Sequence, residues 1–500
     1  MASYKTLLAA LYIAGVGAQA TQTVNAASSG TSASACASTI APRNGQPSVA
    51  PGYQVNVVAS GLTEPRGIIF DSEGNLLVVQ QGKGVSRLRL TNDEGPCIRV
   101  DGQVEDIIDD DDFNHGIELS ADGRTLYAST PEAVYSWNYD ASQGRNTSGP
   151  REVIGQMGET DGHVTRTLLL SRRVEGMLLV SRGSMSNLDP AALDVASGVS
   201  TIKAFNVSST NASSYRFADQ GTLLGWGLRN SVGVAEHPVT GGIFSVENSV
   251  DNFQRNGVNI HQNNPAEELN FHGYLNGTQS PEQGRNFGYP SCYSAWNITE
   301  IPQNNGINVG VQFAIGNQND TVNDLFCQRD RQGPRLAFPA HTAPLDIKFN
   351  SNGTAAWVSF HGSWNRDDPI GYKLSVIPFA SGQPTEPSTS TTAAIDIVSN
   401  PDLSRCPRGC FRPVGLAFDS RGRLFMTSDS TGEIYVVTRT DGGSVNEASP
   451  ANGLPNPSPS ASGVAPSSSP VPGVGVEAFG ENKVGRFGLA WAAVMALLFV

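Results

Sequence analysis

The sequence predicts an all-β fold, specifically a six-bladed β-propeller. Glycine occurs 54 times and proline 30 times in the 500 residues, and only 16% of the residues are charged. This composition is typical of many short strands joined by tight turns. A motif of a small residue, a run of alternating apolar positions, a turn with Gly, Asn or Asp, and a second apolar run recurs six times. Each copy predicts a strand, a turn and a second strand.

The six copies predict six blades of one ring. They are RGIIFDSEGNLLVVQQ from Arg66, HGIELSADGRTLYAST from His115, RTLLLSRRVEGMLLVSR from Arg166, VGVAEHPVTGGIFSVEN from Val232, LDIKFNSNGTAAWVSFH from Leu345 and VGLAFDSRGRLFMTSD from Val414. A blade cannot bury both of its faces alone, whereas a closed ring covers every face. We therefore expect a single propeller domain over residues 36–440.

One interval between copies is unusually long. The separation is about 50 residues for the first three copies and more than 110 between the fourth and the fifth. Loops displayed by a rigid scaffold often carry function, so we expect long functional loops in this interval. The alternative is an insertion without function.

The two ends of the chain predict export and attachment to the cell surface. Residues 1–20 have the layout of a signal peptide, with Lys5 before an apolar run and a small-residue cleavage pattern at 18–20. The run is shorter than the roughly 20 residues that cross a bilayer. Residues 441–480 form a Pro/Ser/Gly-rich linker, and the hydrophobic tail at 481–500 fits a glycolipid (GPI) anchor signal. The alternative for the tail is an unprocessed hydrophobic terminus.

The net charge indicates which partners are not expected, and the cysteine content indicates an oxidising environment. The formal net charge of -13 repels phosphate backbones, so nucleic acid is not expected as a partner. Six cysteines form an even set in a chain expected to be exported, which favours disulfides over a zinc site. We pair Cys36 with Cys97, Cys292 with Cys327, and Cys406 with Cys410. Sequons at Asn146, Asn206, Asn211, Asn276, Asn297, Asn319 and Asn352 agree with a glycoprotein.

Polar residues recur immediately before or at the first strand of the motif, where a propeller directs side chains toward its central channel. They are Arg66, His115, His163, Arg166, Arg229, Asn230, His341 and Arg412. A single arginine is usually a solvated surface charge. Converging guanidinium groups, however, repel one another unless an anion lies between them, and their planar forks suit carboxylates. The pattern predicts that the central channel binds a polyanion.

Familiar nucleotide and metal motifs are missing from the sequence. It contains no Walker loop, nicotinamide fingerprint, nucleophile elbow or His-Glu-x-x-His segment. The acidic run at 109–112 lacks the spacing of an EF-hand, and we leave it open between a calcium site and a hydrated loop.

Several segments together resemble the pyrroloquinoline-quinone-dependent sugar dehydrogenases, in particular the fungal pyranose dehydrogenase and L-sorbosone dehydrogenase-like branch. They are GHVTRTLLL with SRGSMSN (162–187), GLRNSVG (227–233), NPAEELN (264–270) with GRNFGYP (284–290), FPAHTAPL (338–345), FHGSWNRDDPIGYK (360–373) and RPVGLAFD (412–419). The resemblance covers nearly the whole mature chain. It implies a tricarboxylic ortho-quinone cofactor over the propeller axis, in agreement with the converging arginines.

The resemblance assigns roles by position. His163 matches the general base that takes the proton from the C1 hydroxyl of the sugar while hydride passes to the quinone. Arg229 and Asn230 match a pair beside the quinone oxygens, where Arg229 stabilises developing negative charge. The other cofactor contacts that it implies are Arg66, His361, Trp364, Asn365, Arg366 and Arg412, with Lys373 as an additional candidate.

The resemblance also implies a calcium ion that holds the quinone through backbone carbonyls of the loop 262–268. Gln262 and Asn263 are the predicted ligands. Glu267 and Glu268 either cap a nearby strand or bind a second, structural calcium. Gly162 stands where the bacterial pattern has an acidic residue, and the substrate loops do not align, so the sugar is left open.

The sequence thus predicts an extracellular dehydrogenase that oxidises the C1 hydroxyl of a pyranose and passes electrons to a separate external acceptor. One alternative is a calcium-dependent propeller hydrolase such as a lactonase, which needs acidic or Asn ligands at several blade tops. A second alternative is a propeller that binds its ligand without catalysis.

Overall fold

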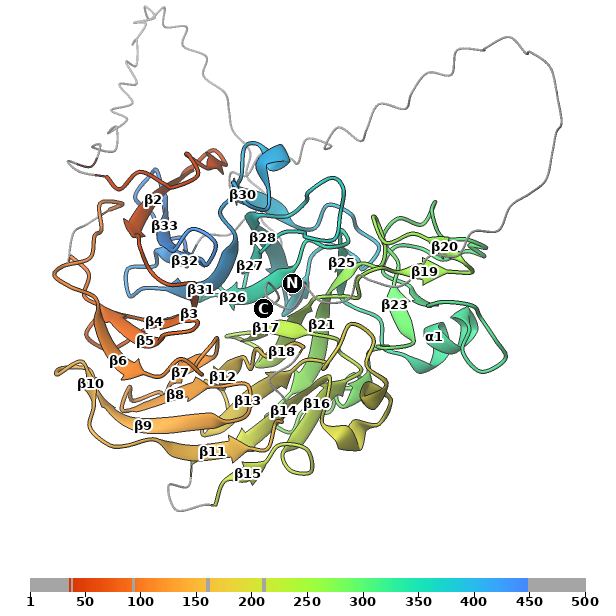
Figure 1. Ribbon diagram of the computed structural model, residues 1–500, viewed down its shortest axis with the longest axis horizontal. Helices are drawn as coiled ribbons and strands as arrows, with labels where there is room; N and C mark the ends of the chain where they lie inside the picture. Colours follow the sequence, from red (N-terminus) through yellow and green to blue (C-terminus); the bar gives the residue numbers. More distant parts are fainter. Residues whose placement is uncertain (1–35, 37–38, 92–94, 159–161, 209–212, 448–500) are drawn as a thin grey trace, which may run out of the picture. The chain divides into compact units, whose positions relative to one another are not determined.

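The computed structural model describes residues 36, 39–91, 95–158, 162–208 and 213–447 (Figure 1). The predicted signal peptide, the hydrophobic tail and most of the linker lie outside the described residues. Strands dominate the described part, in which α1 (Asp324–Asp330) is the one α-helix, beside three short 3-10 helices. Six sheets of four to six strands within this part form a ring of blades, which confirms the predicted six-bladed β-propeller.

Each blade begins with an antiparallel hairpin at the hub and adds further strands outward. The first blade comprises β3 (Pro65–Phe70), β4 (Leu76–Gln80), β5 (Gly84–Leu88) and β6 (Glu105–Asp109). The second comprises β7 (Ile117–Leu119), β8 (Thr125–Ser129), β9 (Val134–Asp140), β11 (Arg151–Gly155) and β15 (Tyr215–Arg216), with β10 (Arg145–Asn146) paired to β9. The third comprises β12 (Leu168–Leu170), β13 (Met177–Arg182), β14 (Thr201–Asn206), β16 (Thr222–Trp226) and β22 (Arg285–Asn286). The fourth blade comprises β17 (Ser231–Glu236), β18 (Gly242–Glu247), β21 (Glu267–Tyr274) and β25 (Leu336–Phe338). The fifth comprises β26 (Pro344–Phe349), β27 (Ala355–Phe360), β28 (Lys373–Ala380), β30 (Ile395–Ser399) and β1 (Ser48–Val49), with β29 (Gln383–Pro384) paired to β28. The sixth comprises β31 (Pro413–Phe418), β32 (Leu424–Ser428), β33 (Glu433–Arg439) and β2 (Tyr53–Ala59).

The innermost hairpins coincide with the six sequence repeats. Neighbouring innermost strands contact one another around the ring, including β3 with β31 where the ring closes. Glycine permits this approach, because a Cβ atom on Gly67 would lie 2.2 Å from the carbonyl oxygen of His115 in the next blade. A Cβ atom on Gly116 would lie 2.1 Å from the carbonyl oxygen of Arg166. The small residue of these copies is therefore required by the close packing of backbones at the hub.

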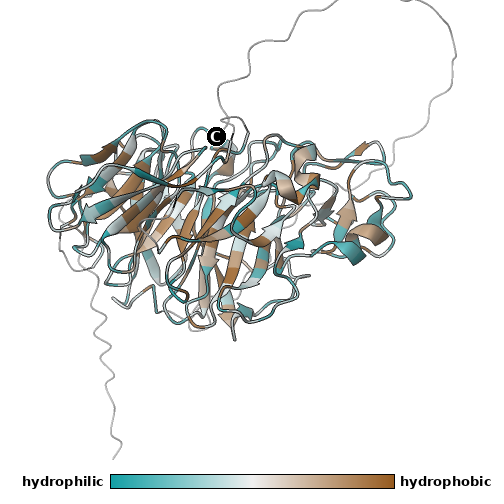
Figure 2. Cartoon of the chain, turned by 90° about the horizontal axis from the view of Figure 1, so that it is seen from below, coloured by the Kyte–Doolittle hydropathy of each residue, from teal (hydrophilic) through white to brown (hydrophobic). Residues whose placement is uncertain are grey.

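The last blade combines strands from both ends of the described chain. β2 pairs antiparallel with β33, and β1 pairs with β30 of the preceding blade. Apolar side chains fill the space between these two blades, among them Trp357 and Tyr435, which are both buried. Figure 2 shows brown, hydrophobic segments along the strands and teal, hydrophilic ones in many of the loops. The ring is thus closed by strand pairing as well as by the apolar core.

The long interval between β18 and β26 contains structure of its own besides the expected loops. Two small sheets form there, from β19 (Gln254–Arg255) with β20 (Val258–Asn259) and from β23 (Cys292–Ser294) with β24 (Gln312–Ala314). The buried Arg255 donates to both carboxylate oxygens of Asp324 at the start of α1, at 2.7 and 2.6 Å. The disulfide from Cys292 to Cys327 joins β23 to α1.

All three predicted disulfides are present. Besides the bond in the long interval, Cys36 pairs with Cys97 and Cys406 with Cys410. In the portion of the chain that the structure describes, no helix combines the length and the apolar composition that a membrane span requires.

Candidate active site

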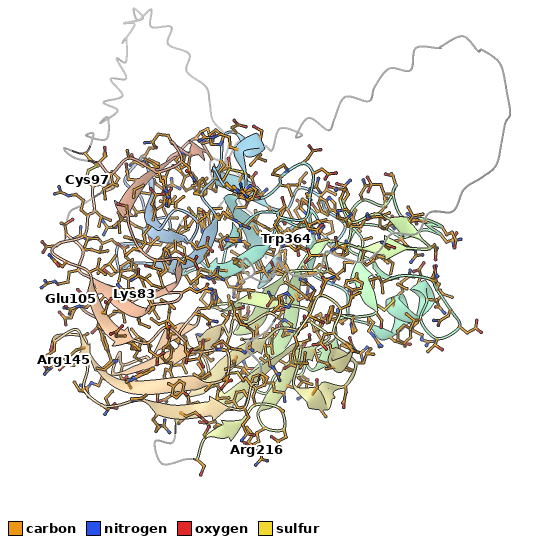
Figure 3. The ribbon with its side chains drawn as sticks, viewed as in Figure 1. Lys83, Cys97, Glu105, Arg145, Arg216 and Trp364 are labelled. Atoms are coloured by element: carbon orange, nitrogen blue, oxygen red, sulfur yellow. A yellow bond between two sulfur atoms is a disulfide. The ribbon has the colours of Figure 1, made fainter. Side chains whose placement is uncertain are left out.

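A cavity of about 430 Å³ lies at the hub, within the size range of small-molecule sites. In an antiparallel hairpin the start of the first strand and the end of the second lie at the same edge, so both positions reach the cavity. Its walls are Arg66, Gly162–Thr165, Ser186, Asn187, Arg229, Asn230, Val232, Asn248, Ser249, Asp251, Asn252, Glu267, His341, Ala343, Leu345, His361, Gly362, Trp364 and Arg412. Figure 3 shows Trp364 in the central part of the ring, whereas Arg145 and Arg216 lie at its outer edge.

The His163 imidazole has a fixed tautomer. Its Nδ1 lies 2.9 Å from both the carbonyl oxygen and the Oγ of Ser184. The Ser184 hydroxyl donates its own proton to the carbonyl oxygen of Ser186 at 2.8 Å, so both Ser184 oxygens act as acceptors. Nδ1 therefore carries the ring proton, and Nε2 keeps a lone pair. Burial and the Arg229 guanidinium lower the pKa of His163 to about 3, so the imidazole is neutral at physiological pH.

The backbone at Gly183 and Ser184 joins the histidine to the neighbouring blade. The Ser184 carbonyl oxygen accepts from the His163 backbone N–H at 3.0 Å, and the Ser184 N–H donates to the Arg229 carbonyl oxygen at 2.8 Å. A Cβ atom on Gly183 would lie 2.6 Å from the Cβ of His163 and 2.7 Å from the Oδ1 of Asn230. Glycine at 183 thus permits His163 and Asn230 to approach each other.

Arg229 is held by side chains that the sequence did not single out. Its guanidinium donates to Asn187 Oδ1 and to Asp251 Oδ2, each at 2.9 Å. Asp251 Oδ1 also lies 3.5 Å from Nδ1 of His341, whose Nε2 donates to the carbonyl oxygen of His261 at 2.6 Å. Burial raises the pKa of Asp251, but His341 and Arg229 outweigh burial and hold it below its usual value. Asp251 is therefore ionised beside Arg229.

A second carboxylate, that of the largely buried Asp429 (side chain 14% exposed), organises the opposite wall. It accepts from Arg66 at 2.8 Å and lies 2.9 Å from Nε2 of His361. Arg412 donates to the carbonyl oxygens of His361 and Gly362 at 3.2 and 3.0 Å. Burial, with Arg412, lowers the pKa of His361 to about 4. Although burial alone would raise the pKa of Asp429, His361 and Arg66 hold it far below the usual range.

Glu267 is the second carboxyl group, after Asp251, that lines the cavity itself. Its Oε2 accepts from the Ser249 backbone N–H at 2.6 Å, and its Oε1 accepts from the Ala343 N–H at 3.4 Å. Burial raises its pKa to about 7. Glu268 is buried behind the wall and accepts from Asn270 at 3.0 Å. Both carboxyl groups are thus satisfied by hydrogen bonds within the protein.

The structure brings most of the predicted site residues together. Those that line the cavity are His163, Arg229, Asn230, Arg66, His361, Trp364 and Arg412, together with His341 from the wider set of channel residues. Those that do not line it are Asn365, Arg366, Gln262 and Asn263, and also Lys373, His115 and Arg166. Lys373 pairs with Asp396 at 2.7 Å, and Arg166 donates to the carbonyl oxygens of His163 and Thr165 at 2.7 and 2.9 Å.

The cavity wall fits an anionic cofactor. Three guanidinium groups, of Arg66, Arg229 and Arg412, come from three different blades, and the two carboxylates held ionised beside them are Asp251 and Asp429. While Glu267 is protonated, this balance leaves one positive charge in excess. The buried Nε of Arg66 has no hydrogen-bond partner among the described residues. A carboxylate-bearing ring would therefore meet cationic donors on several sides of this cavity.

One of the two predicted calcium ligands, the Gln262 carbonyl oxygen, is already in contact with a cationic side chain. The Gln262 carbonyl oxygen accepts from the Arg366 guanidinium, and the Asn263 carbonyl oxygen accepts from the Asn297 N–H at 3.3 Å. A positive guanidinium on the first of these oxygens opposes a cation there, and we assign no step to calcium. Three acidic side chains of the described chain, at 110–112, lie close enough together to share a metal ion, but all three are exposed.

Comparison with known proteins gives close relatives. A family model described as TrAA12-like matches residues 47–440. The chain is 50% identical over 398 residues to the pyrroloquinoline quinone-dependent sugar dehydrogenase of Hypocrea jecorina (strain QM6a), covering 79% of this chain and 90% of that protein. It is 37% identical over 417 residues to the pyrroloquinoline quinone-dependent pyranose dehydrogenase of Coprinopsis cinerea, covering 79% of this chain and 55% of that protein. The chain thus spans about half the length of the second relative.

Solved structures share the fold over most of the described chain. The calcium structure of Trichoderma reesei Carbohydrate-Active Enzymes Family AA12 superposes with a TM-score of 0.78 at 47% identity, covering 81% of this chain and 100% of that one. The holo form of the pyranose dehydrogenase PQQ domain from Coprinopsis cinerea superposes with a TM-score of 0.75 at 35% identity, covering 81% of this chain and 99% of that one.

Proposed function

The chain belongs to the TrAA12-like family, and from this premise we propose that it oxidises the C1 hydroxyl of a pyranose or related sugar. Because the chain is 50% identical to a pyrroloquinoline quinone-dependent sugar dehydrogenase, we class it as a sugar dehydrogenase that depends on the same quinone. The position of oxidation on the sugar and the roles of individual side chains are our proposal. The observation that carries the proposal is the convergence of Arg66, Arg229 and Arg412 on the cavity that His163 also lines.

The cofactor, when bound, supplies an ortho-quinone that accepts a hydride. Arg66, Arg229 and Arg412 would hold its carboxylates and quinone oxygens, and Asn230 would donate beside them. Oxidation of C1 removes a hydride from carbon and a proton from the hydroxyl, which leaves a carbonyl and hence a lactone. His163 takes that proton at Nε2, because the Ser184 oxygens hold Nδ1 protonated. Arg229 stabilises the negative charge that the transferred hydride brings into the cavity.

The segments 1–20 and 481–500 support a proposal about the location, and the cavity at the hub supports one about the electron acceptor. We propose that electrons leave to a separate external acceptor, which enters the same cavity after the lactone departs. We also propose that the enzyme is exported and held at the cell surface by a C-terminal glycolipid. Mass spectrometry of the mature C-terminus tests the anchor, because an intact Val500 end contradicts it.

The test of the proposed function is titration of the apo-protein with pyrroloquinoline quinone, followed by dye reduction with a panel of pyranoses. We expect a spectral change on binding and sugar-dependent reduction of the dye. His163→Gln should still bind the quinone but lose about 10²–10⁴-fold in kcat/KM, the usual contribution of a general base. A lactonase would show no spectral change, and a binding propeller would show the change without turnover. Either result contradicts the proposal.

A further inference from the structure

Three predicted site residues that do not line the cavity, Gln262, Asn263 and Arg366, are in contact with one another. The Arg366 guanidinium donates to the Gln262 carbonyl oxygen and, at 3.1 Å, to Asn263 Oδ1. The Asp367 backbone N–H donates to Gln262 Oε1 at 3.1 Å. These contacts join residues 361–372, which connect β27 to β28, with residues 248–266, which connect β18 to β21.

A further hydrogen bond links the same two segments beside the cavity. Asn365 Nδ2 donates to Asn252 Oδ1 at 3.1 Å, and Asn252 lines the cavity. We call the contacts of Asn365, Arg366 and Asp367 with Asn252, Gln262 and Asn263 the inter-loop bridge. Because the two segments belong to neighbouring blades, the bridge spans the boundary between those blades at the cavity.

Trp364 lies directly before the bridge and at the opening of the cavity. Its side chain lines the cavity, yet the residue is 52% exposed, whereas the adjacent Asn365 is 9% exposed. Trp364 therefore borders both the cavity and the solvent. An aromatic face in such a place suits the C–H face of a pyranose, which buries apolar surface and leaves the sugar hydroxyls to polar partners.

The base of the 361–372 segment is fixed independently of the bridge. The His361 N–H donates to the Ala343 carbonyl oxygen at 2.8 Å, and the Ser363 N–H donates to Ile370 at 2.9 Å. A Cβ atom on Gly362 would lie 2.4 Å from the buried Tyr372 ring, so the two ends of the segment pack tightly. Loss of the bridge should therefore free the tip of the segment and leave its base in place.

We propose that Arg366 is a positioning residue that sets sugar affinity by holding Trp364 at the opening of the cavity. This inference rests on the proposed function in one respect, namely that a pyranose enters there. Arg366 acts through the carbonyl of Gln262 and the side chain of Asn263, and it does not itself line the cavity. Both bonds come from one nitrogen, Nη1, whose two N–H groups can donate to two acceptors at once.

The test is a double-mutant cycle on Arg366 and Trp364. Arg366→Gln should raise KM for the sugar about tenfold with kcat changed less than about twofold, because ground-state and transition-state binding fall together. Trp364→Ala should raise KM at least as much. Adding Arg366→Gln to Trp364→Ala should then have no further effect, since coupled residues are non-additive. Arg366→Lys, which keeps a positive charge and N–H donors on a single nitrogen, should restore part of the affinity.

Matched controls separate this role from a general structural one. Arg329→Gln removes an arginine on α1 whose side chain is 78% exposed, and it should leave KM unchanged. The quinone affinity of Arg366→Gln should equal that of the wild type. Multiplicative effects of the two substitutions, or a weakened quinone, would overturn the positioning role.

Hydrogen exchange tests the bridge without any substrate. Peptides from 248–266 and 361–372 should exchange faster in Arg366→Gln than in Arg329→Gln, because the bridge contributes to the local stability of both segments. Unchanged exchange would overturn the inference. If the wild type shows no quinone-dependent turnover, the proposed function fails, and the exchange experiment still decides whether Arg366 couples the two segments.

Discussion

His163 differs from many catalytic histidines in having a neutral partner at Nδ1. The charged groups that face it are Arg229, Asp251 and Arg166, of which the two arginines disfavour the imidazolium. Its pKa is about 3, and the neutral form is the one that accepts a proton. Activity that depends on this base should therefore persist as the pH falls through 6.5 and should decline only as the pH approaches the lowered pKa.

The pH profile of kcat/KM tests this assignment. With respect to His163, the profile should be flat between about pH 5 and 8, because the base is already unprotonated over that range. Ser184→Asp places a carboxylate beside Nδ1, favours the imidazolium and should move the acidic decline up toward about pH 6. Ser184→Ala keeps the backbone carbonyl and should move it little. The Glu267→Gln background removes a carboxyl group with a pKa of about 7 that titrates in the same range. If kcat/KM of the Glu267→Gln variant, with His163 and Ser184 unchanged, declines around pH 6.5, the result contradicts the assignment.

The residues that sequence reasoning missed share a position in the repeat. The sequence singled out side chains at the start of the first strand, such as Arg66 and Arg412. Ser184, Asp251 and Asp429 instead follow the second strand of their hairpins. Antiparallel pairing brings these two positions to the same edge of the sheet, so the second position could have been searched as well.

Converging arginines require an anion between them, and the sequence pattern predicted that a bound polyanion fills this role. The structure shows that the chain supplies two carboxylates of its own, Asp429 beside Arg66 and Asp251 beside Arg229. The arginines are thus compatible with one another in the apo-protein, and the positive excess that remains is what attracts an anionic ligand.

At the scale of elements, the hub glycines determine how closely the innermost strands pack. Gly116→Ala should lower the free energy of unfolding by about 1–3 kcal/mol, the usual cost of overpacking, because the new methyl group meets the backbone of the next blade. Gly149→Ala is the matched control, since a Cβ atom there has nothing within 4 Å. Urea unfolding of both variants measures the difference. Equal stabilities would contradict the required close approach.

Only elements with a local signal in the sequence could be predicted. The six hairpins were predictable because alternation of apolar residues and a turn between them are local signals. The small elements of the long interval were not, because strands of two or three residues carry no periodicity. They are held by long-range contacts such as the Arg255–Asp324 pair and the Cys292–Cys327 disulfide.

At the scale of the whole molecule, an acidic chain surrounds a basic hub. The formal net charge is -13, yet three arginines face one cavity. Net charge therefore argues against extended polyanions such as nucleic acids, whereas a small anion responds to the local excess of positive charge. Ring closure through β2 and β33 holds the blades that carry Arg66 and Arg412 next to each other.

The most direct measurement is a crystal structure of the protein with pyrroloquinoline quinone bound. The account predicts the quinone in the central cavity, within hydrogen-bond distance of Arg66, Arg229 and Arg412, with Nε2 of His163 facing the space left for the sugar. A quinone bound at the outer edge of the ring, or held in the cavity without contact to these arginines, would contradict it.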